Sequence, residues 1–267
     1  MLLPKLDNLY AIAIQIAAAQ SGPLSANLNQ AVHAQVMNWF SLADPEVGSN
    51  IHNAQISPIA ISGLLGRRRA KNMAKAGDLF TIRVSLLQGS LLSILLAGLE
   101  ESQSMEPLAS ISLDRFPFKV KQILAMPGSN QLVGSAQYSL LAQLPHPGQD
   151  LTLRLVSPTS FRQQGYVQPF PVTQTVFGGL LKRWNHFTPE RFAWPPIEWT
   201  GFVTGYELKT RSVYLKNSPQ LGAEGIVSYR FPDSKQARLA HCLAQFSYFA
   251  GIGRKTSMGM GQTRLKT

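Results

Sequence analysis

Histidine is the side chain best suited to proton transfer near neutral pH, and the sequence has five. His52 stands out because it is expected to lie in or beside a polar loop, predicted at residues 41–50, and has a run of cations shortly downstream. Beside an RNA backbone, an imidazole can take the proton of an attacking ribose 2′-hydroxyl or protonate the leaving 5′ oxygen. His52 is therefore a candidate general acid or base; the alternative is an ordinary surface histidine.

His33 lies on the first predicted helix, one turn from Val36 and Met37. Packing at the edge of the core is one role for it. The other is to share the acid and base work with His52, if both side chains face the same phosphate. The remaining histidines, His146, His186 and His241, are expected to be structural.

A glycine cluster near the end of the chain, GIGRKTSMGMGQTR at residues 251–264, follows a predicted helix. Glycine is costly to order, so such a cluster indicates tight turns or a backbone that another group approaches closely. The cluster comprises Gly251, Gly253, Gly259 and Gly261, with Arg254 and Lys255 between the two glycine pairs.

The overall charge also favours a polyanionic partner. The 267 residues include 25 Lys plus Arg against 14 Asp plus Glu, a net charge of +11. Other cations stand in small groups, which are either RNA contacts or a solvated basic face. These are Arg67, Arg68 and Arg69, Lys182 and Arg183 on a predicted helix, and Lys209 and Arg211 on a predicted strand.

Metal and nucleotide chemistry have no motif in the sequence. There is no His-Glu-x-x-His pair, no Asp-x-Asp and no Walker or Rossmann loop in the required strand–loop–helix context. Cys242, the single cysteine, excludes an intrachain disulfide and a Cys-based zinc site. We therefore expect no metal and no cofactor, and a reducing, cytoplasmic compartment.

The two most apolar stretches are predicted to be parts of a folded core. Residues 9–22 alternate as in a strand rather than a signal peptide, and residues 84–99 are too short and polar for a membrane span. No membrane association is expected.

The order of predicted elements is the same in both halves of the chain. A strand, a helix beginning with a Ser25 cap, two strands, a helix and a strand fill the first half, and the second half repeats this order. This βαββαβ order is the ferredoxin-like, or RRM-like, pattern. The expected fold is α+β with tandem ferredoxin-like domains, 1–145 and 150–267, separated near the Pro- and Gly-containing residues 144–150.

Three segments together resemble the Cas6 family of CRISPR repeat-RNA endoribonucleases, part of the RAMP superfamily. The spacing Gly-Ile-Gly, five residues, Gly-Met-Gly is similar to the family's glycine-rich loop. Residues 49–66 resemble its histidine segment, and residues 167–187 its central region. The resemblance implies that His52 is the catalytic histidine. It also implies that the amides and cations of the glycine-rich loop, Gly251, Gly253, Arg254, Lys255, Gly259 and Gly261, contact RNA phosphates. Some members add a helix tyrosine and a lysine, which residues 31–40 and 52–58 lack, so His33 or the cations at 67–71 are expected to substitute.

The resemblance also implies an activity. It is metal-independent cleavage of CRISPR precursor transcripts within their repeats, leaving 2′,3′-cyclic phosphate and 5′-hydroxyl ends on the crRNAs. The partners implied are repeat RNA and other Cas proteins of an effector complex. Two alternatives stay open: a non-catalytic RAMP subunit that binds the RNA without cutting it, and a general single-strand RNA-binding module.

Overall fold

The computed structural model describes residues 7–67, 72–104, 110–145, 148–215 and 218–266. These residues form two compact units. Unit 1 comprises Met1–Ser135, Tyr214–Ser218 and Ser257–Gly259, and unit 2 comprises Ala136–Val213, Pro219–Thr256 and Met260–Thr267. The sequence predicted domains 1–145 and 150–267, whereas these units divide at Ser135/Ala136.

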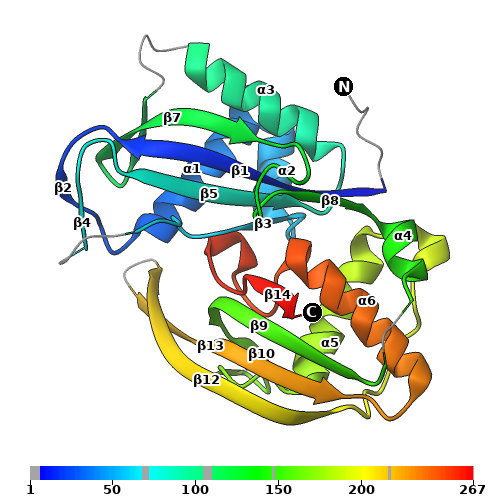
Figure 1. The fold of residues 1–267 in the computed structure, drawn as a ribbon. Helices are drawn as coiled ribbons and strands as arrows, with labels where there is room; N and C mark the ends of the chain where they lie inside the picture. Colours follow the sequence, from blue (N-terminus) through cyan, green and yellow to red (C-terminus); the bar gives the residue numbers. More distant parts are fainter. Residues whose placement is uncertain (1–6, 68–71, 105–109, 146–147, 216–217, 267) are drawn as a thin grey trace. The chain divides into compact units, whose positions relative to one another are not determined.

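Unit 1 has the strand order of a ferredoxin-like fold (Figure 1). Its sheet runs β3-β5-β1-β7-β6, with antiparallel pairing along the path, and β8 also pairs with β1. A short β2–β4 pair lies apart from this sheet. The strands are β1 (Asn8–Ala18), β2 (Gly22–Pro23), β3 (Ile59–Ile61), β4 (Met73–Ala74), β5 (Leu79–Leu86), β6 (Ser110–Leu113), β7 (Phe116–Leu124) and β8 (Gly134–Gln137).

The alternation read from the sequence builds the core of unit 1. Ile12, Ile14 and Ile16 of β1 share one buried cluster with Ile82 and Val84 of β5. The same cluster includes the apolar faces of α1 (Leu28–Ala43) and α3 (Leu91–Ser104). The α+β, ferredoxin-like fold expected from the sequence is confirmed for this half.

Two local expectations about the first half are wrong. The first helix starts at Leu28 after Asn27, and the Ser25 hydroxyl instead accepts from the Asn27 amide in the preceding turn. The predicted polar loop at 41–50 contains most of a second helix, α2 (Pro45–Asn53). Asp44 caps α2 by accepting from the Glu46 and Val47 amides, and Pro45 occupies the first turn, where no amide is needed.

Unit 2 repeats the strand order in its four-stranded sheet, β12-β13-β9-β14. The strands are β9 (Asp150–Thr159), β12 (Phe202–Leu215), β13 (Ser218–Arg230) and β14 (Thr263–Lys266), and the helices are α4 (Tyr138–Gln143), α5 (Thr173–Phe187) and α6 (Ser234–Ala250). A small hairpin, β10 (Phe161–Gln163) and β11 (Tyr166–Gln168), was not predicted. Short 3-10 turns cover Glu190–Phe192 and Thr256–Met258.

Aromatic rings fill the space between the helices of unit 2. Trp184 of α5 meets Tyr138 of α4 at 5.0 Å and Phe246 of α6 at 5.3 Å between ring centroids. Thus α4, which the sequence assigned to the end of the first domain, packs within unit 2. Among the described residues, no helix combines the length and apolar character needed to cross a bilayer.

The contact between α1 and α3 depends on a glycine. A Cβ on Gly98 of α3 would lie 1.7 Å from the carbonyl oxygen of Trp39, whose side chain is fully buried in α1. We predict that Gly98→Ala destabilises the protein by about 1–3 kcal/mol, because the helices must separate. Thermal unfolding measures this.

Gly179→Ala is the matched control, since Gly179 lies in α5 with no atom within 4 Å of the added Cβ. It should stabilise by about 0.4–1 kcal/mol through helix propensity. Equal effects of the two substitutions would contradict this account of the α1–α3 contact.

Candidate functional site

The two histidines singled out in the sequence line the same pocket in unit 1. His33 comes from the second turn of α1 and His52 from the last turn of α2, so His52 does not lie in a loop. The pocket has a volume of about 570 Å³. Its other lining residues are Gln30, Ala34, Met37, Ile51, Ala54, Ser57, Ile59, Ser257 and Met258.

Helix periodicity places these side chains at the pocket. Val32 and Val36 of α1 are fully buried against the sheet, which leaves His33 partly buried at the border of the core. In α2, Ile51 is buried and the adjacent His52 is exposed. Each histidine is therefore fixed through its own helix while its ring reaches the pocket.

The His33 ring is oriented by a backbone hydrogen bond. Its Nδ1 lies 3.0 Å from the carbonyl oxygen of Ser257, a residue 224 positions later in the chain. A carbonyl oxygen can only accept, so Nδ1 carries the proton and donates it. In the neutral imidazole the lone pair then lies on Nε2, where it can accept a proton.

The pocket combines an apolar floor with polar groups at its edge. Met37, Ile51 and Ile59 are buried. Gln30 and Ser57 add an amide and a hydroxyl to the two imidazoles. Such a lining suits a ligand with both a polar backbone and an apolar ring.

The glycines of the C-terminal loop are required by contacts within the protein. All four have positive φ, from 67° to 88°. A Cβ on Gly253 would lie 2.4 Å from the Ser160 carbonyl oxygen, and one on Gly261 would lie 2.1 Å from that of Ile252. Only glycine accommodates both the dihedral angle and the approach.

Most of the glycine amides predicted to face a phosphate have partners inside the protein. The amides of Gly251, Gly259 and Gly261 donate to the carbonyl oxygens of Ser247, Ile61 and Pro158. Hydrogen bonds within the protein therefore account for the positions of these three glycines. Gly253 is exposed and Arg254 and Lys255 are partly buried, so contacts from this part of the loop to RNA stay a prediction.

Arg183 stabilises the same loop through hydrogen bonds from its side chain. Its guanidinium donates to the Ala250 carbonyl at the end of α6 and, over 3.0 Å, to the Thr256 hydroxyl. Burial lowers the pKa of Arg183 to about 10, which leaves it charged at neutral pH. Its neighbour Lys182 is exposed. Arg183 thus has a structural role that the sequence did not predict, and its contact to RNA stays a prediction.

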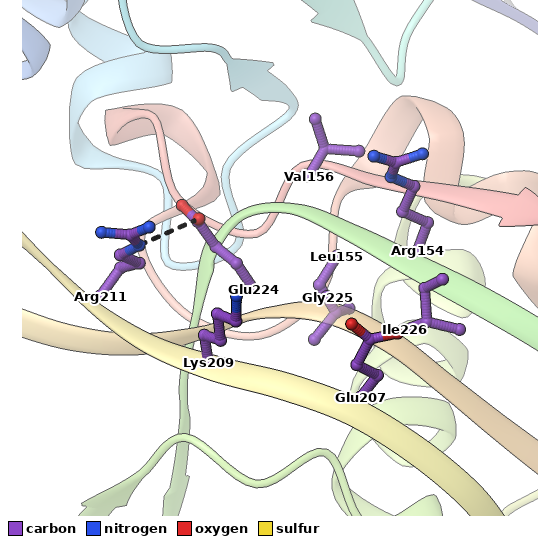
Figure 2. Close-up of a pocket in the computed structure, with 9 residues that line it drawn as sticks. All are labelled: Arg154, Leu155, Val156, Glu207, Lys209, Arg211, Glu224, Gly225 and Ile226. Carbon is purple, nitrogen blue, oxygen red and sulfur yellow. Dashed lines mark ion pairs between the residues drawn. The ribbon is translucent and has the colours of Figure 1, made fainter.

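A second hollow lies on the sheet of unit 2, and two predicted cations border it. Figure 2 shows Lys209 and Arg211 on β12 and Arg154 on β9 around this hollow. Arg211 lies 3.9 Å from Glu224, and Glu207 also lines the hollow. Cations therefore gather on this face without being fully neutralised by carboxylates.

Sequence reasoning missed part of this basic face. Arg154 alternates with the buried Leu153 and Leu155 of β9, so the period of a strand indicated its outward position. On β14, Arg264 pairs with Arg154 and Lys266 with Thr152 across the ladder. Residues paired in this way point to the same side of a sheet, which adds two cations to the face.

The remaining predicted cations are placed as follows. Arg67 is exposed in unit 1, and Arg68 and Arg69 lie outside the described residues. The structure therefore brings together His33, His52 and the Ser257–Gly259 part of the loop in unit 1. It places the loop cations and the basic sheet face in unit 2.

The Arg183 contacts predict a stability effect. Arg183→Met removes the donor to Ala250 and Thr256 and should cost about 1–3 kcal/mol, with faster amide exchange over residues 251–261. Urea unfolding and hydrogen exchange measure both. Lys182→Met, an exposed neighbour on α5, is the control and should change stability by less than about 0.5 kcal/mol. Indistinguishable midpoints for the two variants would rule out the support role.

Comparison with known proteins gives a family match in the second half of the chain. Residues 153–263 match the model of the CRISPR-associated endoribonuclease Cas6. That segment runs from β9 to β14 and includes the glycine-rich loop. A search of curated proteins finds no match.

Solved structures match over nearly the whole chain. The product complex of Cas6 (TTHB231) from Thermus thermophilus superimposes with a TM-score of 0.83 at 20% identity, covering 97% of this chain and 100% of that one. The product complex of Cas6 (TTHA0078) gives 0.74 at 25% identity with the same coverage. A RAMP protein that binds different RNA substrates gives 0.66 at 15% identity, again with 97% and 100% covered.

Proposed function

We propose that this chain is an endoribonuclease that cleaves CRISPR transcripts within their repeats. The match of residues 153–263 to the Cas6 family model and the fold shared with Cas6 structures support this proposal. The observation that carries the proposal is the pocket of unit 1. It holds two histidines together with Ser257 and Met258 of the glycine-rich loop. Two imidazoles at one site are the groups that a metal-free RNA cleavage needs.

The proposed reaction is an internal transfer at one phosphate. The ribose 2′-oxygen attacks the adjacent phosphorus, and the bond from phosphorus to the 5′ oxygen breaks. One imidazole takes the 2′-hydroxyl proton and the other gives a proton to the leaving oxygen. The products are a 2′,3′-cyclic phosphate and a 5′-hydroxyl, and the balance requires no water and no metal in this step.

The surroundings of the two rings favour the base role for one histidine and the acid role for the other. His33 donates through Nδ1 to Ser257, so Nε2 is the atom that would accept the 2′-hydroxyl proton. His52, exposed in the last turn of α2, is then the second imidazole, which is left to protonate the leaving 5′ oxygen. We assign the base role to His33 and the acid role to His52.

The basic sheet face of unit 2 is the proposed phosphate-contacting surface. Arg154, Lys209 and Arg211 offer cations to a backbone without reading its sequence. Arg254 and Lys255 add charge in the loop. The partner this implies is repeat RNA, with other Cas proteins as further proposed partners.

Removing either histidine should abolish most of the cleavage. In single-turnover reactions on repeat RNA in EDTA, His33→Ala and His52→Ala should each lower the rate about a hundredfold or more and leave RNA affinity nearly intact. His186→Ala, an exposed histidine on α5 of unit 2, is the control and should cut at the normal rate. Tight binding without cleavage by the unmodified protein would favour a non-catalytic RAMP subunit instead.

Removing a positive charge and removing a negative charge on the sheet face should change the affinity for RNA in opposite directions. Lys209→Gln should weaken RNA binding and reduce the slope of log K against log salt by about 0.7 for a contact to single-stranded RNA. Glu207→Gln, on the same strand and lining the same hollow, should strengthen binding because it removes a negative charge. Fluorescence anisotropy across a salt series measures both. Two variants with the same affinity as the unmodified protein would exclude this face as a phosphate contact.

A further inference from the structure

The side chain of Asn29, in the first turn of α1, lies between two glycine backbones. A Cβ on Gly63 would stand 2.4 Å from Asn29 Oδ1, and a Cβ on Gly259 would stand 2.6 Å from Asn29 Nδ2. Both distances are too short for any side chain. The same amide group therefore occupies the space that a side chain would need at Gly63 and at Gly259, two positions that are 196 residues apart in the sequence.

The glycine-rich loop is attached to unit 1 at this point. The Gly259 amide donates to the Ile61 carbonyl over 3.1 Å, and Gly259 forms a parallel bridge with Ser62, just after β3. Two residues earlier, the Ser257 carbonyl accepts from His33 Nδ1. The short segment Ser257–Gly259 is thus held at both of its ends.

One face of α1 provides both contacts. Asn29 and His33 are four residues apart in the helix, a spacing that places two side chains on the same face one turn apart. Asn29 contacts the Gly259 end of the segment and His33 the Ser257 end. Asn29 itself does not line the pocket, whereas the adjacent Gln30 does.

We propose that Asn29 is a positioning residue for His33, an inference that rests on the proposed nuclease function. Only Met258 separates Gly259 from Ser257, so the place of Gly259 sets the direction of the Ser257 carbonyl. With the Asn29 amide in place, that carbonyl meets Nδ1 and keeps the lone pair of the neutral ring on Nε2. Without it, the segment settles into the vacated volume and the carbonyl turns away from the ring.

Two substitutions and their combination test this arrangement. Asn29→Ala removes the amide. Gly63→Ala displaces it, because the three atoms nearest to the new Cβ all belong to the Asn29 side chain and no positive φ strains an alanine there. The double variant lets the new Cβ occupy the space that the amide has left. Asn38→Ala, an exposed asparagine on the same helix and outside the pocket lining, is the matched control.

The first readout is the pair of His33 ring ¹⁵N chemical shifts, which report the tautomer and do not depend on cleavage. Asn29→Ala and Gly63→Ala should each move these shifts toward a mixture of tautomers, and Asn38→Ala should not. The second readout is single-turnover cleavage of repeat RNA, which we expect to fall about 10- to 100-fold in both variants, as misplacement of a reacting group by about 1 Å does.

The double variant decides between positioning and general destabilisation. In the Asn29→Ala background, Gly63→Ala should cause no further loss, since its only effect is on the amide. Full additivity of the two rate losses, or unchanged His33 shifts in Asn29→Ala, would overturn the inference. Failure of the unmodified protein to cleave would count against the proposed function alone, because the ring shifts still test the positioning.

Discussion

The hydrogen bond from His33 Nδ1 to the Ser257 carbonyl oxygen is the interaction on which the candidate site depends. It joins α1, near the start of the chain, to the glycine-rich loop near its end. Neither the imidazole nor the carbonyl group would fix the tautomer of the ring without the other. The carbonyl determines which ring nitrogen carries the proton, and the ring gives the loop segment a fixed place beside the pocket.

The loop can make this contact because glycine removes the steric cost at each of its turns. Gly251, Gly253 and Gly261 let the chain fold closely on itself in unit 2, and Gly259 lets it approach Asn29 in unit 1. Arg183 completes the support by donating to Ala250, just before the loop, and to Thr256, in its middle. The positive φ angles and close approaches that glycine allows in this loop therefore serve contacts within the protein.

The two units share a strand order but place different chemistry on it. In unit 1 the helix after the first strand carries Asn29 and His33, and α2 adds His52. In unit 2 the corresponding helix, α5, carries Arg183 toward the loop, and the outward side of the sheet carries Arg154, Lys209 and Arg211. One folding pattern thus supplies imidazoles in one unit and cations in the other.

The tandem ferredoxin-like order could be predicted from the sequence alone, since Ile12, Ile14 and Ile16, and likewise Leu151, Leu153 and Leu155, alternate with a period of two. It also indicated His33, His52 and the glycine-rich loop as candidates. It did not predict α2, although Asp44 and Pro45 are start signals of a helix, because the polar composition of 41–50 suggested a loop. The fold, in contrast, brings the Ser257 carbonyl to His33, places Gly63 and Gly259 around the Asn29 side chain, and directs Arg183 toward the glycine-rich loop. These contacts join residues far apart in the chain, and no local period or spacing encodes which distant backbone group a side chain meets.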